Sequence, residues 1–288
     1  MLKVSSNSNT NTLFHDTTSV FHLEQPWFVL GAATHYDFVV PEDPAISHFY
    51  TFEADQSDST TFAIPDGTID IFFDCDQTSP NVKICGSTLQ ASSARLKHKH
   101  RYFGVRFVAG VMPSFLNLVA EDLVNQELNL FDLLLENEEL IFQIAGHTEF
   151  LGQVALCKHL FAMKPHRKPS PLTRKLIDEM YETKGNLRIK RLEELTGYTS
   201  RTLQRQFQND MGMSPKAFSR IVRGQMAVHN ISQGTQVTFS ELASDLGFSD
   251  QSHFQREFKN LISTTPLNYQ RRIKQGDYLT KIRQNFSQ

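Results

Sequence analysis

Cysteine is scarce in this sequence, and long apolar runs are missing from it. The 288 residues include only Cys75, Cys85 and Cys157, and none of the three belongs to a Cys-x-x-Cys pair. This spacing excludes the usual zinc and redox motifs and favours a reducing compartment. No run of about 18 apolar residues, which a membrane span needs, occurs, and the first residues lack the apolar core of a signal peptide. We therefore expect a cytoplasmic protein.

Motifs of common enzyme sites are also missing. The sequence has no glycine-rich phosphate loop and no nucleophile elbow. Its one His-x-His pair, His98 and His100, is flanked by Lys or Arg at positions 95, 97, 99 and 101, and no third ligand follows at the usual spacing. We expect a basic surface segment there, with no metal, no cofactor and no enzymatic activity in the chain.

The charge of the chain is small overall but unevenly distributed. The formal net charge is −2. Residues 1–165 contain 9 Lys and Arg against 20 Asp and Glu, a net charge of −11, whereas residues 166–288 contain 20 against 11, a net charge of +9. An acidic half joined to a basic half indicates that only the second half meets a polyanion such as nucleic acid. Chance segregation of solvated charges is the alternative.

The pattern of apolar residues divides the chain into two parts. Short runs rich in Phe, Val and Ile predict strands at 27–30, 49–52, 69–73, 82–85 and 102–108. Helical spacing follows over 113–163, while the polar, low-complexity residues within 1–12 favour disorder. Three prolines and three Lys or Arg at 164–171 predict a linker. We expect residues 1–163 to form one domain and residues 172–288 to form a second, entirely helical one.

The basic half contains an internal repeat. Residues 203–220 align without gaps on residues 254–271, with six identities in 18 positions. Upstream, Gly197 and Gly247 occupy corresponding positions. One structural unit used twice is therefore expected.

Each copy has the parts of a helix-turn-helix unit, at about 188–209 and 239–260. Gly197 and Gly247 can take the positive φ that a sharp turn between two helices needs. The next residue, Tyr198 or Phe248, is expected to fill the corner of the turn. The second helix of each unit would be capped by Thr199-Ser200 or by Ser249-Asp250.

A further helix is predicted after each unit. Ser214-Pro215 and Thr265-Pro266 combine a capping residue with proline in the first turn, which is typical of helix starts. The first of these helices is expected to extend to about Ser232 and end near Gly234. Such a helix would hold the two units apart as a rigid spacer, so that both could enter successive major-groove turns of DNA.

The outer faces of the two second helices have the same chemistry. Arg can donate two hydrogen bonds to guanine, and Gln can pair with adenine, so a Gln-Arg pair repeated in both copies predicts base readers. An ordinary solvated helix face is the alternative. The predicted DNA-binding residues are Arg201, Gln204, Arg205 and Gln208 in the first copy and Gln251, Ser252, Gln255, Arg256 and Lys259 in the second.

Two motifs in this half can be compared with a known family. One is Gly212-Met213-Ser214-Pro215 with Phe218; the other extends from Leu242-Ala243 through Gly247-Phe248 to Phe254, Phe258 and Lys259, then Pro266 and Tyr269. Over about residues 172–274 the chain resembles the DNA-binding domain of AraC-type (AraC/XylS family) transcription regulators. It departs from the family pattern at Thr264-Thr265-Pro266, where Gly-x-x-Pro is usual, and at Thr196, where a small apolar residue is common.

The resemblance implies an α+β protein with a β-rich, barrel-like sensing or dimerisation domain followed by an all-α domain of two helix-turn-helix units. It also implies a transcription regulator, and specifically an activator, that binds double-stranded promoter DNA, contacts RNA polymerase and responds to a small-molecule effector as a homodimer. A dimerising DNA-binding protein without any ligand is the alternative. An alkyl-transfer repair enzyme of related build would need a zinc-bound cysteine cluster, which three scattered cysteines do not supply.

The acidic half offers only weak indications of a ligand. Segments 64–70 and 103–107 resemble a recurrent N-terminal domain of such regulators but indicate no ligand. Sixteen of the 23 Phe lie in residues 1–165, which favours a Phe-rich core over an aromatic pocket. Alternation along 102–108 places Arg106 opposite the apolar face, either in solvent or inside a barrel, where it would hold an anion. The candidate ligand-binding residues are Trp27, His35, His48 and Arg106.

Overall fold

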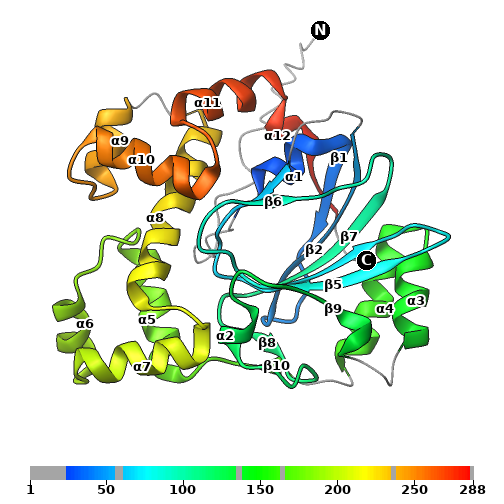
Figure 1. The fold of residues 1–288 in the computed structure, drawn as a ribbon, viewed down its shortest axis with the longest axis horizontal. Coiled ribbons are helices and arrows are strands. Elements are labelled where there is room, and N and C mark those ends of the chain that lie inside the picture. The colour runs from blue at the N-terminus through cyan, green and yellow to red at the C-terminus, as the bar shows by residue number, and fades with distance from the viewer. Residues whose placement is uncertain (1–23, 56–60, 134–137, 163–165, 235–237, 286–288) are drawn as a thin grey trace, which may run out of the picture.

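A computed structural model describes residues 24–55, 61–133, 138–162, 166–234 and 238–285. It shows a β-rich N-terminal part beside a helical C-terminal part (Figure 1). The expected disorder of residues 1–12 lies outside the described residues. No helix within the described ranges is both long and apolar enough to cross a bilayer.

A seven-stranded sheet forms the centre of the N-terminal part. In spatial order the strands are β11 (Ile282–Gln284), β1 (Ala32–Val39), β2 (Ile46–Ala54), β7 (Arg101–Phe107), β4 (Asp70–Asp74), β5 (Asn81–Cys85) and β9 (Glu127–Asn129). Strands β11 and β1 are parallel, and all the other neighbouring pairs in this sheet are antiparallel. Two small sheets pair β3 (Thr61–Ala63) with β6 (Ser92–Ala94) and β8 (Met112–Pro113) with β10 (His166–Arg167).

The two faces of the large sheet bury different cores, as the alternation of side chains along each strand requires. One face, including Phe49, Phe103 and Phe107, packs against helices α3 (Glu138–Gly146) and α4 (Phe150–Ala162). The other face includes Tyr50 and Tyr102 and joins a core shared with the C-terminal helices. Arg106 is buried on this second side, so of the two positions open to it from the sequence, the interior one is confirmed.

The expected α+β architecture is confirmed, but several details of the N-terminal part were wrong. Within the described residues the sheet is open, with β9 and β11 at its ends, rather than a closed barrel. The strand predicted at 27–30 is helix α1 (Pro26–Gly31), because Pro26 occupies its first turn.

The helical spacing of apolar residues over 113–163 also predicted more helix than the structure shows. Residues 114–119 contain no helix, and β9 interrupts the segment. Among the described residues of the segment, helix forms only at α2 (Ala120–Leu123), the 3-10 turn η1 (Leu130–Asp132), α3 and α4. The reason is that Pro113 pairs in β8 with β10, which keeps the chain extended at the point where the helix was expected to begin.

The C-terminal part consists mainly of helices. They are α5 (Pro171–Glu182), α6 (Ile189–Thr196), α7 (Ser200–Met211), α8 (Pro215–Ser232), α9 (Phe239–Asp245), α10 (Gln251–Ile262), α11 (Pro266–Gln275) and α12 (Tyr278–Lys281). The expectation of helix throughout was wrong at the end, because β11 adds to the edge of β1, with Ile282 opposite Tyr36. An edge strand offers unpaired N–H and C=O groups for such an addition.

The local signals of the two helix-turn-helix units are confirmed. Gly197 and Gly247 have φ of 73° and 70°. The side chains of Thr199 and Asp250 cap α7 and α10, and α8 ends at Ser232 as expected. One detail was wrong: Phe248 is buried beneath Arg223 of α8, but Tyr198 is 51% exposed and does not fill its corner.

Candidate nucleic-acid interface and ligand cavity

The second helices of the two units, α7 and α10, bury one face and expose the other. Leu203 and Phe207 of α7 are fully buried, as is Phe254 of α10. Of the predicted DNA-binding residues, those exposed to solvent are Arg201, Gln204, Arg205, Gln251, Ser252, Gln255, Arg256 and Lys259. Because most of them lie in the first two turns of their helices, they occupy the end of a recognition helix that reaches base edges.

Gln208 differs from the other predicted DNA-binding residues. It is half-buried, and its Nε2 donates to the carbonyl oxygen of Gly212 at 2.9 Å. That carbonyl belongs to the residue that ends α7. The amide group therefore has a partner within its own helix end, which makes it a poorer base reader than Arg205.

The two units are separated by α8. Its 18 residues extend for about 27 Å at 1.5 Å per residue. Its start is capped by Ser214, whose side chain accepts a hydrogen bond from Ala217 N. This cap fixes the first turn of α8 a few residues after the end of α7. Figure 1 shows the two units at opposite ends of this helix.

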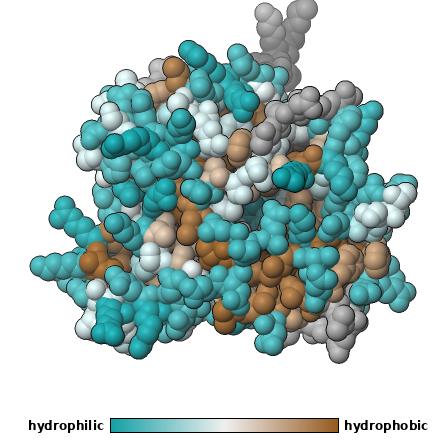
Figure 2. Space-filling model, in the orientation of Figure 1, coloured by the Kyte–Doolittle hydropathy of each residue, from teal (hydrophilic) through white to brown (hydrophobic). Residues whose placement is uncertain are grey.

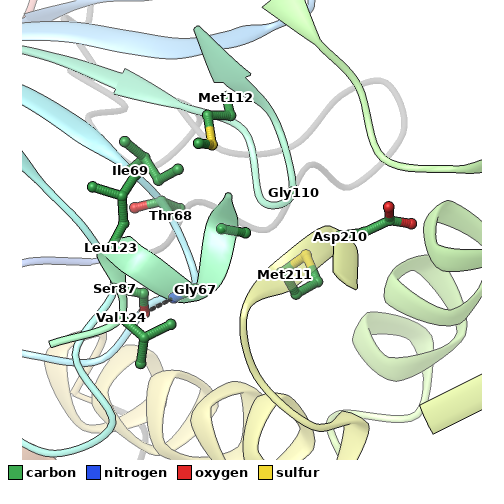
Figure 3. A pocket seen from close by; sticks show the side chains of 11 residues that line it. Gly67, Thr68, Ile69, Ser87, Gly110, Met112, Leu123, Val124, Asp210 and Met211 are labelled. Carbon is green, nitrogen blue, oxygen red and sulfur yellow. Dashed lines mark hydrogen bonds between the residues drawn. The ribbon is translucent and has the colours of Figure 1, made fainter. Parts of the chain in front are cut away.

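The N-terminal part contacts the far end of α7. Figure 3 shows Asp210 and Met211 of α7 facing the loop at Gly67–Thr68 and the turn at Gly110. A Cβ atom added at Gly212 would lie 2.5 Å from the carbonyl oxygen of Ala120 in α2, so the two backbones are in close contact. The N-terminal part thus contacts α7 at its C-terminal end, opposite to the end that carries the exposed Arg201 and Gln204.

The N-terminal part also contacts the far end of α10. The carbonyl oxygen of Asn260 accepts from Ala91 N at 3.1 Å, and that of Ile262 accepts from Trp27 Nε1 at 2.9 Å. Carbonyls in the last turn of a helix have no partner within the helix, so these contacts satisfy acceptors that would otherwise need water. The N-terminal part therefore contacts the C-terminal ends of both recognition helices, by close packing at α7 and by hydrogen bonds at α10.

A third contact joins the N-terminal part to the middle of α8. Gln225 is 1% exposed. Its Oε1 accepts from Glu24 N at 2.9 Å, and its Nε2 donates to the carbonyl oxygen of Pro65 at 2.8 Å. The spacer helix is therefore fixed to the same body that contacts α7 and α10.

Comparison with known families agrees with this architecture. A model of a helix-turn-helix domain matches residues 192–272, and a model of a domain of unknown function matches residues 43–129. An uncharacterised HTH-type transcriptional regulator of Haemophilus influenzae is 30% identical over 114 residues, which are 40% of this chain and 37% of that protein. The chain thus spans less than two fifths of the length of this curated relative. Residues 192–272 thus form a helix-turn-helix domain, and over this region the chain resembles AraC-type transcription regulators.

Two solved structures that match parts of this chain differ in coverage. A probable AraC family transcriptional regulator from Rhodopseudomonas palustris is 31% identical, covers 36% of this chain and 98% of that chain, and has a TM-score of 0.34. ToxT from Vibrio cholerae is 10% identical, covers 79% of this chain and 98% of that chain, and has a TM-score of 0.44.

The candidate ligand residues are not gathered at one place. Trp27 is buried against α10 and α11, where its ring packs edge-on to Tyr269 of α11 at 5.7 Å. His48 is buried in the sheet beside Tyr50, and Ser47 Oγ lies 3.0 Å from its Nδ1. The Nδ1 atom of His35 is buried without a hydrogen-bond partner among the described residues.

Of these four candidates, Arg106 lines a large cavity of the described N-terminal part. The cavity has a volume of about 190 Å³. Its lining includes Asp66, Asp70, Phe72 and Tyr102, none of which was a candidate in the sequence. Asp70 stands directly opposite Arg106 across the β4–β7 pair, a relationship that the sequence could reveal only if the strand register were known.

The guanidinium group of Arg106 already forms ion pairs with two carboxylates. Its Nε donates to Asp70 Oδ1 at 2.9 Å and its Nη2 to Asp70 Oδ2 at 2.7 Å, and Nη1 lies 3.4 Å from Asp66 Oδ2. Burial raises the pKa of Asp70, although the nearby guanidinium opposes this. Bidentate pairing of this kind leaves little of the guanidinium to hold an anion.

Proposed function

We propose that this AraC-type chain binds promoter DNA sequence-specifically and regulates transcription. The observation that supports this most strongly is the repetition of one exposed Gln-Arg pair at the start of two recognition helices, Gln204-Arg205 in α7 and Gln255-Arg256 in α10. Figure 2 shows that the side carrying these units is largely hydrophilic, as a surface facing a polyanion should be. The net charge of +9 in residues 166–288 has the right sign.

The arrangement of the two units suggests the form of the DNA site. Both units have the same direction along the chain, and α8 joins them as one rigid spacer. The two half-sites should therefore be direct repeats about 10–10.5 bp apart on one face of the duplex.

Selection of duplexes from a randomised pool with the full-length protein tests this function. Enrichment of two direct half-sites, one helical turn apart, is the expected result. Failure to enrich any sequence over several rounds, while non-specific binding persists at low salt, would contradict sequence-specific recognition.

Control by an effector in the N-terminal part belongs to the same proposal. The cavity is lined by Gln25, Ile64 and Asp66, and the next residue in the chain after Ile64, Pro65, accepts the hydrogen bond from Gln225 of α8. A ligand that displaces this segment would move the spacer helix relative to the sheet. Binding energy in the cavity could in this way favour one arrangement of the two units over another.

Three further parts of the proposal rest on the family resemblance alone, and a fourth, location in the cytoplasm, rests on the scarcity and spacing of cysteine. The three are activation rather than repression, contact with RNA polymerase, and action as a homodimer. Light scattering on the purified chain tests the last: a homodimer should have twice the 32.9 kDa mass of one chain, and a mass of 32.9 kDa at all accessible concentrations would exclude it.

A further inference from the structure

The cavity contains more buried negative charge than positive charge. Asp66 and Asp70 are 4% and 8% exposed, and Arg106 is 2% exposed. Two carboxylates and one guanidinium give a formal charge of −1. Among the described residues, no other Lys, Arg or His makes an ion pair with either carboxylate. Burying an uncompensated charge is costly, so this cluster favours an additional cation or hydrogen-bond donor.

Asp66 is the less well compensated of the two carboxylates. Its closest guanidinium nitrogen is 3.4 Å away, whereas Asp70 receives two hydrogen bonds of 2.7 and 2.9 Å from the same guanidinium. Of the other cations that line the cavity, Lys83 pairs with Glu127 at 2.8 Å and Lys97 pairs with Asp74 at 3.2 Å. Arg95 is exposed to solvent and makes no ion pair with Asp66 or Asp70 among the described residues. Asp66 accepts hydrogen bonds from Gln25 Nε2 and Thr68 N, but of the two carboxylates it has the weaker ionic partner.

Aromatic rings form much of the wall beside this charge. Phe72 stacks on Tyr102 with ring centroids 5.1 Å apart and on Phe28 at 6.1 Å, and Tyr50 lies 6.5 Å from Phe72. All four rings line the cavity. The face of such a ring attracts a cation within about 6 Å of its centroid.

The cavity also presents one hydroxyl that lacks a partner. Thr88 lines it, and its buried Oγ1 has no hydrogen-bond partner within the described ranges. A hydroxyl oxygen can accept a hydrogen bond from an ammonium group as well as donate one. A ligand with several N–H donors would suit it.

We propose that the effector of this protein is a small organic cation with an aromatic body, bound with its charge at Asp66 and its ring against the aromatic wall formed by Phe28, Tyr50, Phe72 and Tyr102. An anionic effector is disfavoured because Arg106 is already bound by two carboxylates. The inference rests on the proposed function only in calling the ligand an effector; binding to the cavity is a separate claim.

The same site can be linked to α8 through one side chain. Gln25 Nε2 donates to Asp66 Oδ2 at 2.8 Å and to the Ile64 carbonyl oxygen at 2.7 Å. An ammonium group at Asp66 would compete with Gln25 for the carboxylate. This competition would act on the segment whose Pro65 carbonyl oxygen holds Gln225.

Calorimetric titration of the full chain with two matched probes tests the ligand class. Phenethylamine and phenylacetate share an aromatic body and have opposite charges. Saturable binding of the amine, at least about tenfold tighter than the acid, is the expected result. Binding of the acid as tightly as the amine, or of neither probe, would overturn the proposal.

The variant Asp66→Asn distinguishes recognition of the ligand's charge from general damage to the fold. The variant should lose at least about tenfold in affinity for the amine and should gain affinity for the acid, because Arg106 is then less neutralised. Equal loss of both probes would indicate only a damaged cavity and would count against the assignment of Asp66. Asp245→Asn, on the exposed surface of α9, is the matched control and should change neither affinity.

DNA binding by the full chain without probe is measured in parallel. Amine binding without sequence-specific DNA binding would leave the cavity assignment intact and refute the proposed function. DNA binding without amine binding would refute the cavity assignment and leave the proposed function intact.

Discussion

Gln225, in the middle of the spacer helix, donates a hydrogen bond of 2.8 Å to the carbonyl oxygen of Pro65 in the N-terminal part. The two residues are 160 positions apart. The same side chain accepts from Glu24 N. One amide group therefore fixes α8 to the part of the protein that contains the cavity. Because α8 separates the two helix-turn-helix units, this contact also fixes their position relative to that part.

Replacing Gln225 with leucine should destabilise the chain by about 1–3 kcal/mol, because a buried acceptor on Pro65 and a donor on Glu24 would lose their partner. The free energy of unfolding, from urea denaturation, measures the effect. Gln233→Leu, at the exposed end of the same helix, is the control and should have little effect. Equal stability of the Gln225 variant and the wild type would show that this contact does not hold the parts together.

Ser263 occupies a backbone conformation that suits glycine. It ends α10 with φ of 68°, and its counterpart in the first unit, Gly212, ends α7 with φ of 71°. Ser263→Gly should therefore raise the free energy of unfolding by up to about 1 kcal/mol. Ser240→Gly, in exposed helix α9, should lower it by about 0.5–1 kcal/mol. A loss of stability in both variants would argue against strain at Ser263.

The reverse substitution in the first unit should be harmful. In Gly212→Ala the new Cβ atom would lie 2.5 Å from the Ala120 carbonyl oxygen, in addition to the unfavourable φ. A shift of α7 away from α2 would relieve the clash. We expect a lower melting temperature for this variant; an unchanged one would contradict the close contact.

His229 should make stability depend on pH. Its Nδ1 lies 2.8 Å from Glu24 Oε1, and this hydrogen bond raises the histidine pKa above its ordinary value of 6.5. A raised pKa in the folded state gives a stabilising contribution that is fully present below the unfolded pKa. That contribution is lost as the pH rises through the folded pKa.

Melting temperatures at about pH 5.5 and about pH 8.5 measure this contribution. The difference between the wild type and His229→Gln should be larger at the lower pH. His159→Gln, an exposed position in α4, is the control. A difference that is larger at the higher pH would reverse the assigned sign.

The helix-turn-helix units could be predicted from the sequence because their signals are local. Gly197 and Gly247 set the turns, Thr199 and Asp250 cap the recognition helices, and the apolar spacing of Phe254 and Phe258 marks the buried face. Each of these signals lies within one unit, and the repeat presents most of them twice. The prediction that Tyr198 fills the corner of its turn was wrong, because the surroundings of this side chain depend on tertiary packing, which the repeat does not reveal.

The cavity and the contacts between the parts could not be predicted, since they depend on long-range pairing. Asp70 meets Arg106 only in one register of strands 36 residues apart. Trp27 reaches the Ile262 carbonyl oxygen across 235 positions, in a segment whose short apolar run fitted a strand as well as a helix. The end of the chain gave no sign that Ile282 would join a sheet edge.

Salt should weaken DNA binding steeply. Each neutralised phosphate contributes about −0.9 to the slope of log K against log salt concentration, so six to ten contacts would lower affinity by about 10³–10⁵ between 50 and 200 mM salt. A filter-binding titration with the selected duplex measures the slope. A nearly flat slope would contradict an interface built on the basic half.

Base preference at each half-site tests the central claim most directly. The full-length wild type, Arg205→Ala and Arg256→Ala are compared on duplexes carrying every single-base change in the selected site. Each variant should lose about 1–3 kcal/mol on the cognate site and lose base preference at one half-site only, with Arg205 and Arg256 affecting different half-sites. Equal losses on cognate and random DNA, with the preference at both half-sites intact, would contradict the reading of bases by these two helices.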